Sequence, residues 1–137
     1  TKFLEDKQIA KLVLATIFWC EGSKTLKGSL AFGNSDGKLV ALFCSLLRKV
    51  YVVNESRLRA TLQCRADQNI PYLNSYWSEI TGIPLKQFYL ARIDKRTIGK
   101  PSKKKEYKGV CRIDYFCADV FNELVAINKV LSDYMGP

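Results

Sequence analysis

The sequence predicts an α+β fold in one domain. Apolar residues recur at helical spacing over residues 6–21, and residues 57–65 alternate strictly between apolar and polar side chains, as in a half-buried strand. The length of 137 residues suits one domain, and 47% hydrophobic residues are enough to form a core. We therefore expect residues 1–137 to fold as a single domain.

The first half of the chain begins with a helix over residues 6–21 that ends at Gly22. Residues 12–20 of this helix are apolar nearly all round, so we expect it to be buried on more than one side, in the core or against a second chain. Residues 24–34 predict a strand or a short hairpin with its turn near residues 26–28. The capping sequence 34–37 then precedes a helix over residues 38–50.

The second half contains the strand 57–65, whose odd positions are Arg57, Arg59, Thr61, Gln63 and Arg65. A helix over 71–80, a strand over 89–96, a flexible basic loop over 97–108 and a strand over 110–117 follow. An amphipathic helix over 118–134 closes the chain. Strand alternation places Arg92, Asp94 and Arg96 on one face, and likewise Arg112 and Asp114.

The charge is strongly positive and unevenly distributed. The chain carries 22 basic and 13 acidic residues, and ten of the basic residues lie between positions 86 and 112 with only two acidic ones. Such a balance favours a polyanionic partner. The absence of histidine excludes catalytic triads with an imidazole base and zinc sites with histidine ligands.

Apolar runs stay shorter than the ~18 residues of a membrane helix, and the first residues do not resemble a signal peptide. We therefore expect a soluble intracellular protein, in the cytoplasm or an organelle matrix, with no membrane partner. The five cysteines include no C-x-x-C pair. Free thiols that pack as small core residues are the expected state.

The residue types on the predicted strand faces favour double-stranded DNA as the partner. In the major groove Arg reads guanine, Gln reads adenine and Asp accepts from cytosine, while loop lysines suit phosphate contacts. Tyr89 alone is placed to stack on an unpaired base, so a duplex is favoured over a single strand. The expected DNA-binding residues are Arg57, Arg59, Thr61, Gln63, Arg65, Arg92, Asp94, Arg96, Lys100, Lys103, Lys104, Lys105, Lys108, Arg112 and Asp114.

Glu21 is the conspicuous carboxylate. It ends an apolar helix, where the negative end of the helix dipole disfavours an acid. A bound divalent cation would offset this penalty. The alternative is that Glu21 simply begins a surface loop.

Residues 14–22, LATIFWCEG, resemble the motif that names the LAGLIDADG homing endonucleases. Leu14, Ala15 and Gly22 match it, and Glu21 takes the place of its last acid. Thr16 stands where the family has a small glycine, and Trp19 replaces the first acid. The resemblance implies an αββαββα arrangement with an antiparallel DNA-binding sheet, a saddle, to which the helix near residues 71–80 is an addition.

With one motif copy, the resemblance implies a homodimer that cleaves specific double-stranded DNA. Glu21 would bind the metal, Mg²⁺ or Mn²⁺ with Ca²⁺ as a non-catalytic substitute, and Lys95 and Gln63 are candidates for side chains near the scissile phosphates. The implied dimer interface comprises Leu12, Ala15, Thr16, Trp19 and Cys20. Two alternatives stay open: a DNA-binding regulator of the same fold without nuclease activity, and an RNA-binding protein like the maturases of the same family.

Overall fold

The computed structural model describes residues 2–23 and 28–134. Within them lie four α-helices and five strands: α1 (Lys7–Glu21), β1 (Gly22–Ser23), β2 (Leu30–Asn34), α2 (Gly37–Val50), β3 (Leu58–Arg65), α3 (Ile70–Thr81), β4 (Arg92–Asp94), β5 (Val110–Tyr115) and α4 (Ala118–Tyr134). The α+β class and the four helices were predicted from the sequence. The predicted strand start and turn at residues 24–27 lie outside the described residues.

Side-chain caps explain where the helices begin. Asp6 accepts a hydrogen bond from the backbone N–H of Gln8 at 2.8 Å, and Asp36 accepts one from Lys38 at 2.9 Å. Helix α3 begins after Asn69, which caps it in the same way, and ends at Gly82, whose φ of +71° suits a residue without a side chain. These local signals are readable in the sequence, and for this reason the helix boundaries were predicted closely.

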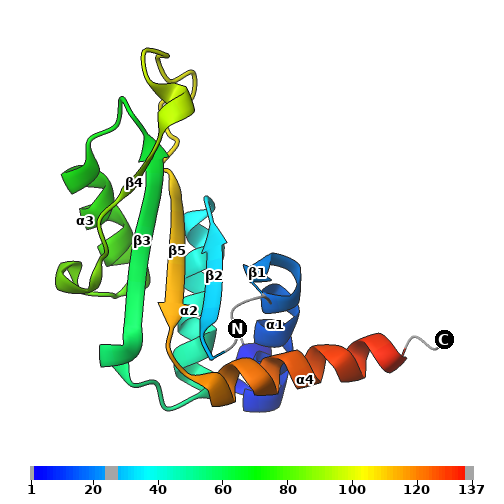
Figure 1. Cartoon of the computed structure of the whole chain (residues 1–137). Coiled ribbons are helices and arrows are strands. Elements are labelled where there is room, and N and C mark those ends of the chain that lie inside the picture. The colour runs from blue at the N-terminus through cyan, green and yellow to red at the C-terminus, as the bar shows by residue number, and fades with distance from the viewer. Residues whose placement is uncertain (1, 24–27, 135–137) are drawn as a thin grey trace.

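The five strands form one mixed sheet in the order β1-β2-β5-β3-β4. The pairs β1–β2, β2–β5 and β5–β3 are antiparallel, whereas β4 runs parallel to β3. The predicted all-antiparallel sheet is therefore wrong at this edge. Helix α3 lies between β3 and β4 in the chain and returns the backbone to the starting end of β3, so the two strands run in the same direction (Figure 1).

Strand β4 is also shorter than the predicted strand over 89–96. The carboxylate of Asp94 accepts a hydrogen bond from the backbone N–H of Arg96 at 3.0 Å and thereby caps the 3-10 turn Lys95–Thr97. An Asp that bonds its own backbone two residues ahead favours a turn over an extended strand. Lys95 and Arg96 consequently belong to a turn.

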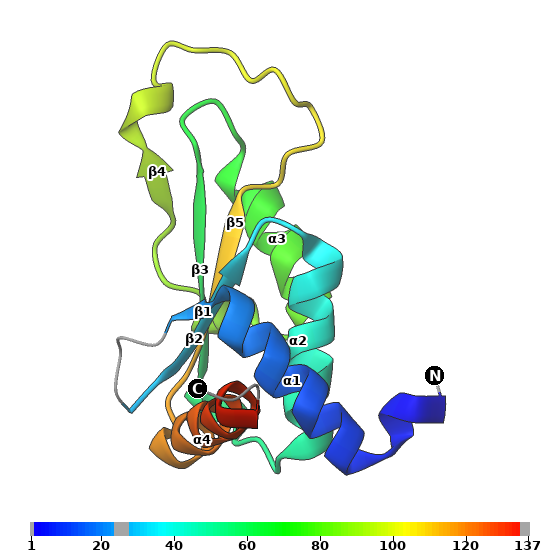
Figure 2. The same cartoon turned by 90° about the vertical axis from the view of Figure 1, so that its right-hand side faces the viewer.

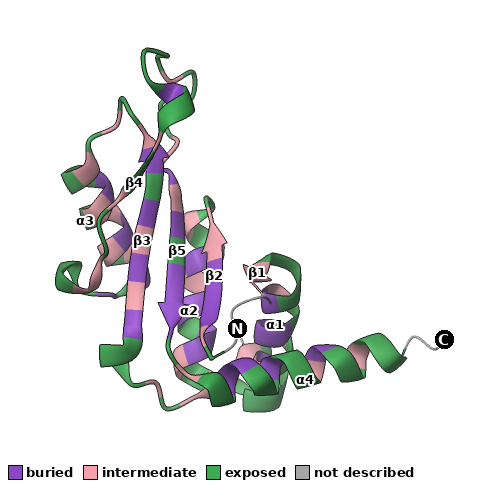
Figure 3. Ribbon diagram, viewed as in Figure 1, coloured by how far each residue is buried: buried purple, intermediate pink, exposed green. Residues whose placement is uncertain are grey.

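Helices cover only one face of the sheet. Figure 2 shows α1, α2 and α3 on one side of the strands, and Figure 3 shows buried positions alternating along β3. The core face of β3 presents Leu58, Ala60, Leu62 and Cys64, each at most 2% exposed. The opposite face, here called the open face, carries the alternate residues of β3, β4 and β5.

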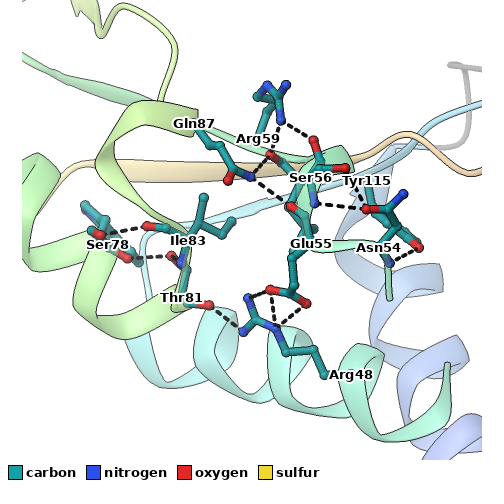
Figure 4. A network of polar contacts seen from close by, with 12 residues as sticks. Arg48, Asn54, Glu55, Ser56, Arg59, Ser78, Thr81, Ile83, Gln87 and Tyr115 are labelled. Carbon is teal, nitrogen blue, oxygen red and sulfur yellow. Dashed lines mark hydrogen bonds and ion pairs between the residues drawn. The ribbon is translucent and has the colours of Figure 1, made fainter. Parts of the chain in front are cut away.

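A hydrogen-bond network holds α3 and the turn after it to the rest of the fold (Figure 4). Arg48 of α2 donates to the carbonyl of Thr81 at 2.6 Å and binds the carboxylate of Glu55 at 2.9 Å. Gln87 donates to the carbonyls of Glu55 and Leu58, both at 2.8 Å. Because these contacts join α2, α3 and the start of β3, they fix the segment that leads into β4.

Helix α4 packs against α1 through its first half and extends beyond the body of the molecule in Figure 1. None of the helices in the described ranges combines the length and the apolar character needed to cross a lipid bilayer.

Candidate nucleic-acid interface

The predicted DNA-binding residues that lie on β3, β4 and β5 share the open face, as strand alternation requires, whereas Arg57 and Arg96 lie outside these strands. Register pairs across the sheet lie on the same side. Arg59 pairs with Asp114 and Thr61 with Arg112 across β3 and β5, while Gln63 pairs with Arg92 across β3 and β4. Asp94 pairs in the same way with Arg65. The sequence pattern was therefore sufficient to predict which strand residues share this face.

A hollow of about 440 Å³ lies on the open face, here called the sheet hollow. It is lined by Ser29, Thr61, Gln63, Tyr89, Arg92, Val110, Arg112, Asp114 and Phe116. Most of these side chains carry hydrogen-bonding groups, and two aromatic rings belong to the lining. Phe116, which is 40% exposed, joins the predicted Tyr89 there. The only sign in the sequence that Phe116 could line this surface is its position directly after β5.

A second hollow, of about 610 Å³, lies under the basic loop of residues 97–109 and is here called the loop hollow. Its lining includes five cations and one carboxylate: Arg65, Arg96, Lys100, Lys103, Lys104 and Asp94. It shares Gln63 and Val110 with the sheet hollow, so the two hollows adjoin. A polyanion that crosses the sheet would meet this cluster of positive charge.

Hydrogen bonds tie the basic loop to the residues at the end of β3. Arg65 donates to the carbonyl of Lys100 at 2.6 Å, and the backbone N–H of Ser102 donates to Asp67 at 2.8 Å. The bond from Ser102 is the main reason that the pKa of Asp67 is lowered. Lys100, Lys103, Lys104 and Lys105 remain exposed on this tethered backbone.

Helix α3 and Gln68, just before it, anchor the far end of the loop. The indole N–H of Trp77 donates to the carbonyl of Lys108 at 2.8 Å, and Gln68 donates to the carbonyl of Tyr107 at 2.6 Å. The ammonium of Lys108 lies 5.5 Å from the ring centre of Tyr72. Lys108 is thus directed towards α3, unlike the other predicted phosphate-binding lysines.

Several of the predicted DNA-contacting arginines already have partners within the protein. Arg112 binds Asp114 through two nitrogens, the closer pair at 3.0 Å, and Arg96 binds Asp94 in the same manner at 2.9 Å. The guanidinium of Arg96 is the main cause of the lowered pKa of Asp94. In each pair the acid and the arginine are two residues apart, so strand alternation places them on the same face. This spacing could have predicted the ion pairs from the sequence.

Two further arginines donate to backbone carbonyls. Arg59 donates to Ser56 and Leu58, both at 2.7 Å, and Arg57 lies just before β3 and donates to Phe116 at 3.4 Å. Every residue has a backbone carbonyl, so the sequence alone could not show which carbonyls these arginines would bind.

Glu21 is the last residue of α1, and its side chain is exposed. The amide of Asn34 donates to its carboxylate at 3.3 Å, while the side-chain oxygen of Asn34 accepts from the backbone N–H of Asp36 at 2.8 Å. Because that acceptor fixes the orientation of the amide, its N–H₂ group faces Glu21. Sequence reasoning interpreted Asn34 only as part of a helix cap and missed this contact.

The structure does not bring the three predicted catalytic residues together within one chain. Glu21 directly precedes β1, Gln63 lies on β3, and Lys95 follows β4 at the opposite edge of the sheet. With strands about 4.8 Å apart, the edges β1 and β4 are separated by roughly 19 Å. Lys95 and Glu21 therefore cannot act on the same phosphate within one chain.

The carboxylates and thiols of the described residues are not clustered. Among the described residues there is no group of three or more Cys, Asp or Glu side chains that could hold a cation. Glu21 offers a single carboxylate, whereas Mg²⁺ is usually held by one or two carboxylates together with substrate phosphates. A second Glu21 or bound DNA would have to supply the remaining ligands.

Helix α1 is buried on one side and exposes apolar residues on the other. Ala10, Leu14 and Phe18 are fully buried, whereas Leu12 is 47% and Trp19 40% exposed. Thr16 and Cys20 lie on the same exposed side. Here the α1 face means the exposed residues Ile9, Leu12, Thr16, Trp19 and Cys20. Ala15, which was included in the predicted interface, is fully buried in the core and does not belong to this face.

All five cysteines are free thiols, as predicted. Burial raises the pKa of Cys44 to about 12, and it also raises the pKa of Cys64 and Cys111. Thiols with a raised pKa are poor nucleophiles. These three cysteines therefore act as core residues.

The arrangement as a whole offers hydrogen-bond donors on an open sheet face, next to a tethered loop of exposed lysines. A comparison with models of known protein families, with curated proteins and with solved structures finds no match to this chain. The function is therefore inferred from the geometry and charge of this interface.

Proposed function

We propose that this protein binds double-stranded DNA in a sequence-specific manner through the open face. The observation that carries the proposal is the juxtaposition of two surfaces: the polar strand residues of the sheet hollow and the lysines around the loop hollow. Loop lysines neutralise phosphates and supply affinity, whereas strand side chains of fixed direction read base edges. A two-dimensional array of this kind suits a duplex groove.

Competition between nucleic acids tests the kind of partner. The polar lining of the sheet hollow supports a duplex, while its two aromatic residues, Tyr89 and Phe116, are the feature that a single strand would use for stacking. We expect a labelled DNA duplex to be displaced by unlabelled duplex much more readily than by single-stranded DNA or by RNA. Preferential displacement by RNA would instead support the maturase-like alternative.

We further propose that the protein is a homodimer through the α1 face. A row of Leu12, Thr16 and Trp19 on one side of a helix leaves apolar surface in water, and a second copy would cover it. A two-fold axis along α1 would also bring the two Glu21 side chains towards each other, because Glu21 ends the same helix. This arrangement is the one that the resemblance to the LAGLIDADG family implies.

Metal-dependent cleavage of the bound DNA is the second candidate function. It is favoured by the position of Glu21 at the junction of the α1 face and the sheet. Two Glu21 carboxylates and the DNA phosphates make a donor set that Mg²⁺ or Mn²⁺ accepts. A DNA-binding regulator that does not cleave is the alternative.

The deciding experiment is a screen of plasmid targets with and without Mg²⁺ or Mn²⁺. Glu21→Gln keeps the size of an exposed side chain, so the fold should be unaffected. We expect it to abolish cutting and to leave DNA binding intact or tighter, since it removes a negative charge. Ca²⁺ should support binding without cutting. A wild-type protein that binds duplexes but cuts none of them with either metal would favour the regulator.

A further inference from the structure

The side chains of the open face differ in whether their hydrogen-bonding groups are free. The planar fork of Arg112 is occupied by Asp114, and that of Arg96 by Asp94. Arg65 binds Asp67 at 3.2 Å and the carbonyl of Lys100. A fork bound on two nitrogens by a carboxylate cannot also bind a base on those nitrogens.

Among the described arginine and glutamine side chains of the open face, Gln63 and Arg92 are the exceptions. In residues 2–23 and 28–134 neither side chain makes a hydrogen bond or an ion pair, and both are exposed. They are direct register partners in the parallel pair β3 and β4, and both line the sheet hollow. A complete amide and a complete guanidinium thus stand next to each other on the open face.

The spacing of the two residues matches neighbouring base pairs. Paired strands lie about 4.8 Å apart, and successive base pairs rise by about 3.4 Å along each DNA strand. Long side chains close such a difference easily. Gln forms two hydrogen bonds with adenine, and Arg forms two with the O6 and N7 atoms of guanine.

We infer that Gln63 and Arg92 form a reading pair for an adenine and a guanine in adjacent base pairs of the major groove. The inference rests on the proposed binding of double-stranded DNA and names the residues that set its specificity. The sequence predicts both residues on strand faces, and the structure adds that they are direct neighbours in the parallel pair β3 and β4. The remaining arginines of the open face stay bound to their partners within the protein and contribute positive charge.

The test is selection of bound duplexes from a randomised pool, followed by sequencing, in EDTA so that no cleavage intervenes. For the wild-type protein we expect a preferred site with an adenine next to a guanine. Arg92→Ala should reduce the preference for guanine at one position on the order of tenfold, the discrimination typical of one bidentate contact. Gln63→Ala should do the same for adenine at the neighbouring position.

Two further variants sharpen the test. Arg96→Ala is the matched control, because it removes the same charge from an exposed arginine whose fork is bound by Asp94. It should weaken binding to all sequences alike and leave the preferred site unchanged. Gln63→Arg should convert the preference at its position from adenine to guanine. Circular dichroism and thermal unfolding confirm that each variant is folded.

The outcomes separate the inference from the proposed function. A wild-type protein that binds no duplex overturns both. Duplex binding with a clear preference that survives in Arg92→Ala and Gln63→Ala overturns the reading pair alone. So does binding without any preference, a change of the preferred site in Arg96→Ala, or loss of preference at two positions that are not adjacent.

Discussion

At the scale of single residues, Trp77 shows how one buried side chain serves a distant surface. Its ring is fully buried in the core, where it packs edge-on against Tyr76 with centroids 5.2 Å apart. Its N–H reaches out to the carbonyl of Lys108 at the end of the basic loop. The same residue therefore stabilises the core and holds the loop.

Replacing Trp77 tests this double role. Trp77→Phe leaves the Lys108 carbonyl without its donor and opens a cavity, so we expect a loss of about 1–3 kcal/mol in the free energy of unfolding. Urea denaturation followed by circular dichroism measures it. The control is Tyr134→Phe, an exposed aromatic residue of α4 outside the α1 face, which should change stability by less than about 0.5 kcal/mol. Equal losses in the two variants would contradict the assignment.

At the scale of elements, Glu123 of α4 joins three segments. Its carboxylate binds the ammonium of Lys11 in α1 at 2.6 Å and accepts from the hydroxyl of Tyr51 after α2 at 2.7 Å. The hydrogen bonds from Lys11 and Tyr51 lower the pKa of Glu123. Burial and the bond to Glu123 raise the pKa of Tyr51.

The lowered pKa of Glu123 makes part of the stability depend on pH. A carboxylate whose folded-state pKa lies below its unfolded value, about 4.3, stabilises the fold above that value. The contribution is lost as the pH falls through the folded-state pKa. Glu123→Gln should therefore be less stable than wild type at pH 7, by less than about 1 kcal/mol because the pair is partly exposed.

Urea denaturation at pH 7 and pH 3 measures this difference, which should shrink at the lower pH. Glu79→Gln is the control, because Glu79 is exposed and makes no ion pair within the described residues. A difference for Glu123→Gln that stays constant between the two pH values would exclude an electrostatic origin.

The basic loop is the second element with a testable role. Lys104→Ala should weaken binding to matched and mismatched duplexes alike and lower the slope of log affinity against log salt by about one, as expected for one lost phosphate contact. Salt titration of binding gives the slope. Lys49→Ala removes another exposed lysine, from α2 on the helix side of the sheet, and should leave the slope unchanged. A sequence-dependent loss in Lys104→Ala would assign base reading to the loop.

The elements also show where sequence reasoning succeeds. Helix caps and strand alternation are local, so α1, α2, α3 and the face of β3 could be predicted. The direction of β4 could not, because it depends on how α3 packs against α2 and β3. The contact between Glu21 and Asn34 also depends on how two elements pack together, so it could not be predicted from the sequence.

At the scale of the whole molecule, the α1 face decides the oligomeric state. Thr16→Arg places a charge from each copy at the proposed contact, and since Thr16 is exposed the protomer should still fold. We expect wild-type dimers and Thr16→Arg monomers in multi-angle light scattering. Alkylation of Cys20 should be faster in the variant, because the contact no longer covers it.

Ser45→Arg on α2 is the matched control, as it adds the same charge at an exposed position outside the α1 face. It should remain a dimer with slow alkylation. Wild-type protein that is monomeric both free and on DNA would refute the dimer.

The position of β5 has a consequence for the order of folding. This strand lies in the middle of the sheet, between β2 and β3, yet it is the last strand in the chain. Leu30 must find Tyr115, so most of the chain has to be present before the sheet can close. Pairing across such a separation in sequence slows folding. Until β5 arrives, β2 and β3 have unpaired edges, and a nascent chain at the ribosome is most exposed to aggregation during this interval.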